Sequence, residues 1–254
     1  MTLQFASLGS GSRGNATLIK SRQALLLIDC GFTIKETERR LDILGHSPND
    51  ISAILVTHEH SDHIKGVGPF ARKHQLPIYA THGTAQYHGF TKLPSLTAIN
   101  IQQPFNLADI EITPVAVPHD AREPCQFVFR SAKKTVGLLT DLGSITPHVT
   151  EQYRDCDALM LECNHCLQML SMGPYPPSLK ARVSGQWGHL NNQQAANFLA
   201  EINTERLQHL VISHISEKNN TETLARQAIA AVYGERPSLI LAEQNNVLNW
   251  MTVQ

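Results

Sequence analysis

The chain has 254 residues, of which 42% are hydrophobic, so it is long enough to bury a sizeable core. Charged residues make up 17% of the chain and nearly cancel, for a net charge of -1. This balance excludes a broadly cationic surface that wraps nucleic acid, so any nucleic-acid partner is expected at a local site.

Apolar runs of strand length alternate with amphipathic segments along the whole chain. The predicted strands are 3–8, 15–20, 24–29, 52–57, 77–80, 110–117, 125–130, 134–140, 157–162, 208–213 and 238–242. Several runs, such as "AILVT" and "TVGLLT", are apolar on both faces, which is typical of strands covered from both sides.

Helices are predicted between these strands. Their expected ranges are 33–45, 66–74, 81–89, 148–154, 191–202 and 221–234. Thr33 and Glu36 have the spacing of a capping box at the start of the first helix. The Gly- and Pro-rich segment 168–188 is predicted to be a long surface loop. The pattern indicates an α/β fold of two packed sheets with helices outside, in a single domain spanning 1–254.

Membrane and disulfide signals are weak. No run of about 18 apolar residues is present, so no membrane span is expected. The N-terminus lacks a basic start followed by an apolar stretch, so we expect a cytoplasmic protein. Of the five cysteines, Cys163 and Cys166 form a CxxC without a second such pair, so buried free thiols are expected rather than a zinc ribbon.

The stretch "AILVTHEHSDH" at 53–63 places four metal-capable side chains directly after a predicted strand. His58 and His60, two positions apart, can meet one ion from a tight loop, and Asp62 and His63 can serve a second ion. Imidazole and carboxylate groups suit zinc, manganese or iron. The motif therefore predicts a site for two divalent ions.

Three later strands also end in a histidine or an aspartate. His119 follows "ITPVAVP", Asp141 follows "TVGLLT", and His214 follows "LQHLVIS". Ligand sites in layered α/β folds form where strand ends converge, so these side chains are expected to join the first motif. Asp141 is the candidate to bridge both ions, because a carboxylate has two oxygens. The remaining histidines without such a context are expected to be ordinary surface or packing residues: His46, His74, His82, His88, His148 and His209.

Several polar residues are candidates for binding substrate. The glycine-rich loop "GSGSRGN" forms either an anion-binding nest or a plain turn; its polar side chains belong to Ser10, Ser12, Arg13 and Asn15. Asn164 and His165 follow another strand-like run, where they bind phosphate, orient a metal ligand or have only a structural role. His189 precedes a helix, where it donates a proton, binds phosphate or merely caps the helix. In the long loop, Lys180 and Arg182 either contact the backbone of a bound nucleic-acid strand or are simply solvated. Trp187 either stacks on a base or packs against the protein.

"THEHSDH" resembles the signature of the metallo-β-lactamase fold, a four-layer αββα sandwich, and "LLLIDCG" resembles its motif in which an aspartate, here Asp29, supports the metal loop. "SLGSGSRGN", "LECNH" and "HISEKNN" are similar to the YycJ-like (WalJ) branch, whose members are taken to be 5′-to-3′ DNA exonucleases. "GHLNNQQAANFLA" resembles the tRNase Z group, which implies that His189 is the proton donor. Cys166, where the branch is expected to have an aspartate, and Arg13 depart from the pattern.

The resemblance implies a ligand set. His58, His60 and His119 would hold one ion, Asp62, His63 and His214 the other, and Asp141 would bridge them.

The resemblance also implies a function. We expect a dinuclear-metal phosphodiesterase, a 5′-3′ exodeoxyribonuclease that attacks DNA through a metal-bridging hydroxide, with Asp62 and His189 as catalytic residues. Its partner would be DNA ends or RNA, with no membrane. The alternatives are a small cyclic phosphodiesterase, a glyoxalase II-like thioesterase or lactonase, and a protein that holds nucleic-acid ends without cutting. The choice of metal and the oligomeric state stay open.

Overall fold

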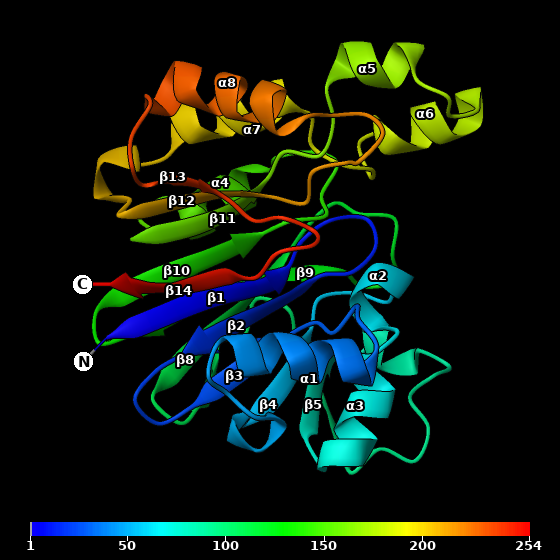
Figure 1. Ribbon diagram of the computed structural model, residues 1–254, viewed down its shortest axis with the longest axis vertical. Helices are drawn as coiled ribbons and strands as arrows, with labels where there is room; N and C mark the ends of the chain where they lie inside the picture. Colours follow the sequence, from blue (N-terminus) through cyan, green and yellow to red (C-terminus); the bar gives the residue numbers. More distant parts are fainter. Residues whose placement is uncertain (1) are drawn as a thin grey trace.

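Two seven-stranded sheets pack face to face in the computed structural model, which describes residues 2–254 (Figure 1). In sheet order, the first contains β14 (Leu248–Val253), β1 (Leu3–Gly9), β2 (Ala16–Lys20), β3 (Leu25–Ile28), β4 (Ala53–Val56), β5 (Pro77–Thr81) and β6 (Ser95–Ile99). The second contains β13 (Leu239–Leu241), β12 (His209–Ser213), β11 (Ala158–Glu162), β10 (Lys134–Leu139), β9 (Cys125–Ser131), β8 (Ile110–Ala116) and β7 (Phe105–Leu107). All eleven predicted strands are present.

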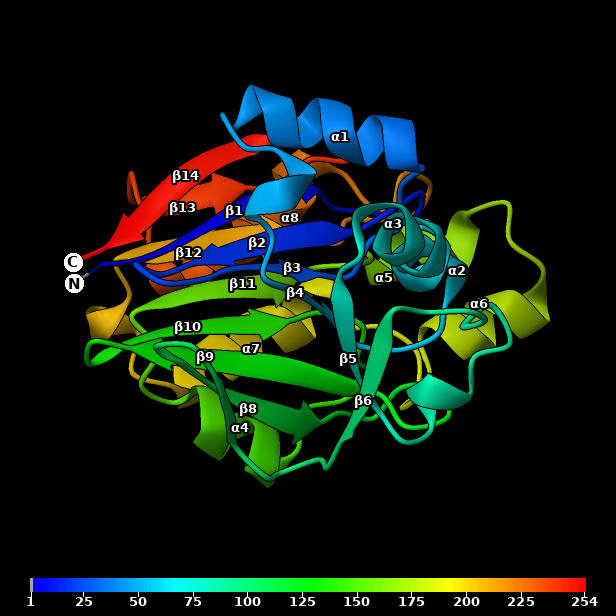
Figure 2. The ribbon, with the colours of Figure 1, turned by 90° about the horizontal axis from the view of Figure 1, so that it is seen from below.

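Helices cover the outer face of each sheet. α1 (Ile34–Ile43) and α3 (Val67–His74) lie on the first sheet, and α4 (Pro147–Tyr153), α7 (Asn192–Glu201) and α8 (Glu222–Tyr233) lie on the second (Figure 1, Figure 2). This arrangement is the predicted four-layer αββα sandwich.

Three buried clusters explain why the central strands are apolar on both faces. One lies between the sheets and includes Phe5, Phe127 and Met160. The other two lie between each sheet and its own helices, around Phe70 on one side and Phe198 on the other. A strand such as β4 therefore contacts a core on each face, and all four of its residues are buried.

The structure differs from the predicted elements in a few places. Segment 81–89 contains only the short 3₁₀ helix η2 (Thr84–Gln86), and two more 3₁₀ turns are η1 (Pro48–Asp50) and η3 (Thr204–Arg206). The predicted loop 168–188 instead contains α5 (Leu167–Met172) and α6 (Pro177–Val183), which stand beyond the sandwich at the upper right of Figure 1. β6, β7, β14 and the one-turn helix α2 (Ser61–Ile64) were not predicted.

The described residues 2–254 contain no helix long and apolar enough to cross a bilayer. All five cysteines are free thiols, and four of them are buried. Cys163 and Cys166 form no disulfide, and neither belongs to a group of metal-capable side chains within the described part of the chain.

Candidate metal centre

The side chains that follow four strands, β4, β8, β10 and β12, converge at one end of the sandwich. β3, β4 and β5 run parallel in one sheet, as do β10, β11 and β12 in the other, so their carboxyl ends lie at the same edge of each sheet. The loop after β4 carries His58 and His60, and α2 carries Asp62 and His63. The other sheet supplies the side chains that follow β8, β10 and β12.

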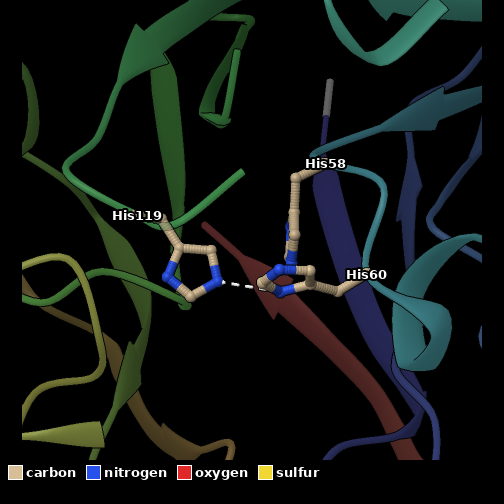
Figure 3. A group of neighbouring side chains, drawn as sticks. All are labelled: His58, His60 and His119. Carbon is tan, nitrogen blue, oxygen red and sulfur yellow. Dashed lines mark hydrogen bonds between the residues drawn. The ribbon is translucent and has the colours of Figure 1, made fainter. Parts of the chain in front are cut away.

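The first group of side chains is made of three histidines, His58, His60 and His119 (Figure 3). Their ligand atoms lie within 4.8 Å of one another. His60 Nδ1 and His119 Nε2 are only 3.1 Å apart, and the rings of His58 and His119 meet edge to face at 4.9 Å between centroids. The three nitrogens therefore point toward one small volume.

Backbone carbonyls decide which nitrogen of two of these rings carries the proton. His119 Nδ1 donates to the Gly188 carbonyl over 2.9 Å, and His60 Nε2 donates to the Asp120 carbonyl over 3.2 Å. The two nitrogens that face each other, His60 Nδ1 and His119 Nε2, therefore both present lone pairs. Two lone pairs at 3.1 Å repel each other unless a cation lies beside them.

The second group combines Asp62, His63, Asp141 and His214. His63 Nε2 lies 3.5 Å from Asp62 Oδ2 and 3.3 Å from Asp141 Oδ2, and His214 Nε2 lies 3.6 Å from Asp62 Oδ2. The groups adjoin, because the ring centroids of His58 and His63 are 4.3 Å apart. All seven predicted ligands are thus brought together in two adjacent sets.

Asp29 holds a residue of each set from behind. Its carboxylate accepts hydrogen bonds from His63 Nδ1 at 2.8 Å and from the Thr57 hydroxyl at 2.7 Å. Because the Thr57 hydroxyl donates to Asp29, its oxygen is free to accept from His58 Nδ1, 3.0 Å away. One buried carboxylate therefore orients His58 and His63 so that the Nε2 atom of each faces the centre.

Glu162, at the end of β11, was not predicted as a site residue. It is fully buried and accepts from His189 Nδ1 at 2.8 Å, from His214 Nδ1 at 2.9 Å and from the Leu190 amide at 2.9 Å. A charged residue at the end of the apolar run "ALMLE" is the sequence signal that could have identified it. Glu162 fixes the tautomers of His189 and His214, and leaves the Nε2 atom of both free.

Burial and neighbouring charges shift the pKa values of the ligand side chains in two directions. Burial, reinforced by nearby histidines, lowers the pKa of His58 far below its usual value and that of His119 to about 4, so both are neutral ligands at pH 7. Burial also opposes the charged form of His214, but the carboxylates of Asp141, Asp62 and Glu162 outweigh it and raise the pKa to about 10. In the second set, protonated His214 therefore supplies the positive charge that a metal ion would supply beside the carboxylates.

A cavity of about 340 Å³ opens over both sets. Its lining includes the ligands His60, Asp62, Asp141 and His214, together with His189. On the remaining sides lie residues of α6 and of the loops that follow β11 and β12.

The predicted substrate-binding residues are only partly found in this cavity. Ser12 and Asn164 line it. Ser10 Oγ accepts from the His214 amide, and Asn15 Nδ2 contacts Asp62 Oδ2 at 3.2 Å. Both are buried, so they act on the ligand loops rather than on the cavity. Two further residues also do not line the cavity: His165 is fully buried, and Arg13 is exposed and paired with Glu217.

The other residues singled out in the sequence lie as follows. Arg182 lines the cavity and pairs with Asp120, whereas Lys180 donates to the Ser171 carbonyl. Trp187 is 62% exposed and is not part of the lining. The six histidines for which no site role was expected belong to none of the metal-capable groups found within residues 2–254.

Comparison with known proteins identifies the family. The Beta-lactamase superfamily domain matches residues 25–215. The chain is 37% identical to the exodeoxyribonuclease YycJ of Bacillus anthracis over 93% of its own length and 91% of that protein, and 32% identical to the exodeoxyribonuclease WalJ of Streptococcus pneumoniae D39 over 89% and 86%. The crystal structure of YhfI from Bacillus subtilis, a metallo-β-lactamase fold protein, superimposes with a TM-score of 0.74 at 20% identity, covering 97% of this chain and 99% of that one. The chain therefore belongs to the beta-lactamase superfamily, has the metallo-β-lactamase fold, and falls in the branch that contains YycJ and WalJ.

Proposed function

We propose that this protein is a metal-dependent hydrolase of phosphodiester bonds that removes nucleotides from the 5′ end of DNA with the help of two divalent ions. The observation that carries the proposal is the pair of adjoining ligand sets, which share one cavity with the Glu162–His189 pair. Relatives that match almost the whole chain are named exodeoxyribonucleases, which supports DNA as the substrate.

The residues present fit divalent ions. His58 Nε2 and Asp141 Oδ2 are buried without a hydrogen-bond partner, although such atoms are normally satisfied in folded proteins. Together with the facing lone pairs of His60 and His119, they leave unmet acceptors in both sets. Nitrogen and carboxylate ligands suit zinc or manganese, and also iron. We assign His58, His60 and His119 to one ion and Asp62, His63 and His214 to the other, with Asp141 between them.

When bound, the two ions would supply Lewis-acid chemistry, since they neutralise phosphate charge and lower the pKa of water to about 7. The chain itself positions the reacting groups. Asp62 lines the cavity and can accept a hydrogen bond from the attacking water, which orients a lone pair toward phosphorus. With both ions in place, the two sets would form the floor of the cavity against which the scissile phosphate binds.

His189 is the proposed proton donor to the departing oxygen. Its Nδ1–H is held by Glu162, so Nε2 is the atom that carries the transferable proton. Its ring lies between those of His119 and His214, at centroid distances of 5.2 and 5.3 Å, so it adjoins both ligand sets. General acid catalysis of this kind typically contributes roughly 10²–10⁴-fold to the rate.

The proposal is tested with single-stranded DNA labelled at the 5′ or the 3′ end, matched RNA, a cyclic nucleotide and S-lactoylglutathione, each incubated with protein reconstituted in manganese or zinc. Release of mononucleotides from the 5′ end of DNA, abolished in Asp141→Ala, is the expected result. Hydrolysis of the cyclic nucleotide or the thioester, without cleavage of any strand, would refute the nuclease function and leave the metal centre in place.

A further inference from the structure

The cavity has two chemically different sides. One side carries the ion pair between Arg182 and Asp120, and Asp120 also contacts His60 of the first ligand set. The other side carries no charge: its lining residues are Ser12, Asn164, Tyr175, Leu179, Val183, Ser216 and Asn219. Phosphates are expected on the charged side, so the neutral side must receive another part of the substrate.

The polar residues of the neutral side form a fixed hydrogen-bonded unit. Asn164 Nδ2 donates to the His214 carbonyl at 3.1 Å, and the Ser216 amide donates to the Asn164 carbonyl at 2.9 Å. Ser216 Oγ accepts from the amide and the side chain of Asn219, each at 3.3 Å. Because this oxygen accepts twice, its own O–H is free to donate to a ligand. The unit thus offers neutral hydrogen-bonding groups in a rigid arrangement, next to the ligand His214.

The opposite part of the neutral side is apolar and comes from α6 and the turn before it. Leu179 and Val183 are four residues apart in α6, so they lie on one face of this helix, and Tyr175 lines the cavity from the turn before it. All three are half-buried. The Lys218 ammonium lies 5.8 Å from the centroid of the Tyr175 ring. Lys218 is an exposed side chain on a flexible stem, so a flat group that enters the cavity can take its place against the ring.

A nucleoside combines the two properties that this side of the cavity offers. Its base has an apolar face that stacks on an aromatic ring, and its edges and sugar carry neutral hydrogen-bonding groups. The cavity volume of about 340 Å³ is near the lower end of the roughly 300–1,000 Å³ typical of ligand pockets, so it has room for a single nucleotide and not for a duplex.

We infer that the neutral side binds the nucleoside of the terminal nucleotide, with the base stacked on Tyr175 and the Asn164–Ser216–Asn219 unit contacting its polar edge. This inference rests on the proposed phosphodiesterase function. The cavity would then accommodate a single unpaired nucleotide. The base would contribute to binding whatever its identity, since every base has a stacking face.

The test compares oligonucleotides that have either a normal base or an abasic tetrahydrofuran unit at the end. We expect the wild-type protein to show a KM roughly 5- to 150-fold lower for the normal end, which corresponds to the stacking of one base. Tyr175→Ala should remove this ratio, and Tyr175→Phe should keep it. Trp187→Ala is the matched control: it removes an aromatic residue of the same segment outside the cavity lining and should leave the ratio unchanged.

Two further measurements separate the possible failures. Hydrolysis of bis(p-nitrophenyl) phosphate reports on the metal centre alone; if it is normal in all variants while the KM ratio is absent or insensitive to Tyr175, the nucleoside inference is wrong and the proposed function stands. If the metal-loaded wild-type protein hydrolyses no diester, the proposed function fails. In that case calorimetric titration with thymidine 5′-monophosphate and deoxyribose 5-phosphate still decides the inference, because equal affinity for the two compounds overturns it.

Discussion

Glu162→Gln is the most informative single substitution, because this buried carboxylate supports both the proposed metal ligand His214 and the proposed proton donor His189. The glutamine has the same shape but replaces one oxygen by an NH₂ group. All strong contacts of Glu162 are with N–H donors: His189 and His214 meet Oε1, and the Leu190 amide meets Oε2. Whichever way the amide turns, its NH₂ group therefore faces a donor.

The cost follows from these contacts. Burial opposes the charged form of Glu162, but His189 and His214 outweigh it and lower its pKa to about 2, so the substitution removes a full charge at pH 7. Hydrogen bonds to a charged group contribute about 1.5–3 kcal/mol each, and a buried donor without a partner costs about 1–3 kcal/mol. We expect the metal-free protein to lose about 2–4 kcal/mol of unfolding free energy, a fall in Tm of roughly 4–16 °C.

The functional effect should exceed the loss of stability. His214 loses the partner that orients it, which typically weakens metal affinity about 10–100-fold. His189 loses the carboxylate that fixes its tautomer, so DNA hydrolysis should fall by roughly 10²–10⁴-fold even when both ions are supplied in excess.

The assay measures metal affinity by competition with a chelator, and the cleavage of end-labelled DNA at saturating metal. Glu151→Gln is the matched control, because Glu151 lies on α4 with its side chain 69% exposed, and it should behave as wild type. A Glu162→Gln protein that loses thermal stability but keeps metal affinity and DNA cleavage within twofold would refute the reasoning and reduce Glu162 to a packing role.

Three other substitutions test separate parts of the structure. His189→Ala should retain both ions and cleave bis(p-nitrophenyl) phosphate, whose leaving group needs little acid assistance, but cleave DNA roughly 10²–10⁴-fold more slowly; unchanged DNA cleavage would exclude the proton-donor role. Asp29→Asn should weaken metal affinity about 10–100-fold, since it removes the charged acceptor of His63 Nδ1, and an unaltered chelator titration would contradict this. Hydrogen bonds from Arg39 and Arg40 lower the pKa of Glu36 to about 2, so its stabilising effect is present above pH 4.5 and is lost as the pH falls toward 2. Melting curves should therefore show Glu36→Gln less stable than wild type at pH 7, with the difference shrinking below pH 4.5; a difference independent of pH would be inconsistent with this ion pair.

Much of the sandwich could be predicted because its central strands are buried on both faces. Every residue of a strand such as β4 or β11 is buried, so apolar side chains along the strand stabilise the fold. The apolar run in the sequence is therefore nearly unbroken, and the strand's end is easy to recognise. β6 lacks this signal: it lies at the edge of its sheet with four of its five residues exposed, so no unbroken apolar run is needed there.

Prolines explain the error in the segment before His189. Pro174, Pro176 and Pro177 favour an irregular loop in the sequence, but proline also fits the first turn of a helix, where its missing N–H would have no partner. α6 begins at Pro177 in this way. The difference matters for function, because it places Tyr175, Leu179 and Arg182 on an ordered wall of the cavity.

The convergence of the ligands depends on backbone turns that no ligand pattern reveals. Asp29, Asp141 and His214 all have left-handed backbone conformations, with φ of 59°, 55° and 52°, and each follows the end of a strand. For residues other than glycine this conformation costs about 1–2 kcal/mol, although Asp and His tolerate it better than most. Asp141 and His214 contribute their side chains to the centre from this conformation, and Asp29 contacts His63 from behind it. Hydrogen bonds donated by the amides of these residues help to offset the cost of the conformation.

The groups that receive these amides come from distant parts of the sequence. The Asp29 amide donates to the Leu55 carbonyl at 2.8 Å, the Asp141 amide approaches Glu162 Oε1 at 3.3 Å, and the His214 amide donates to Ser10 Oγ at 2.9 Å. Ser10, a predicted substrate contact, accepts the amide of the turn that carries His214 and does not line the cavity. Residue types and their order along the chain are therefore enough to predict which metal-capable side chains converge. The geometry that brings them together also depends on buried partners such as Ser10 and Glu162, whose contribution follows from tertiary contacts alone.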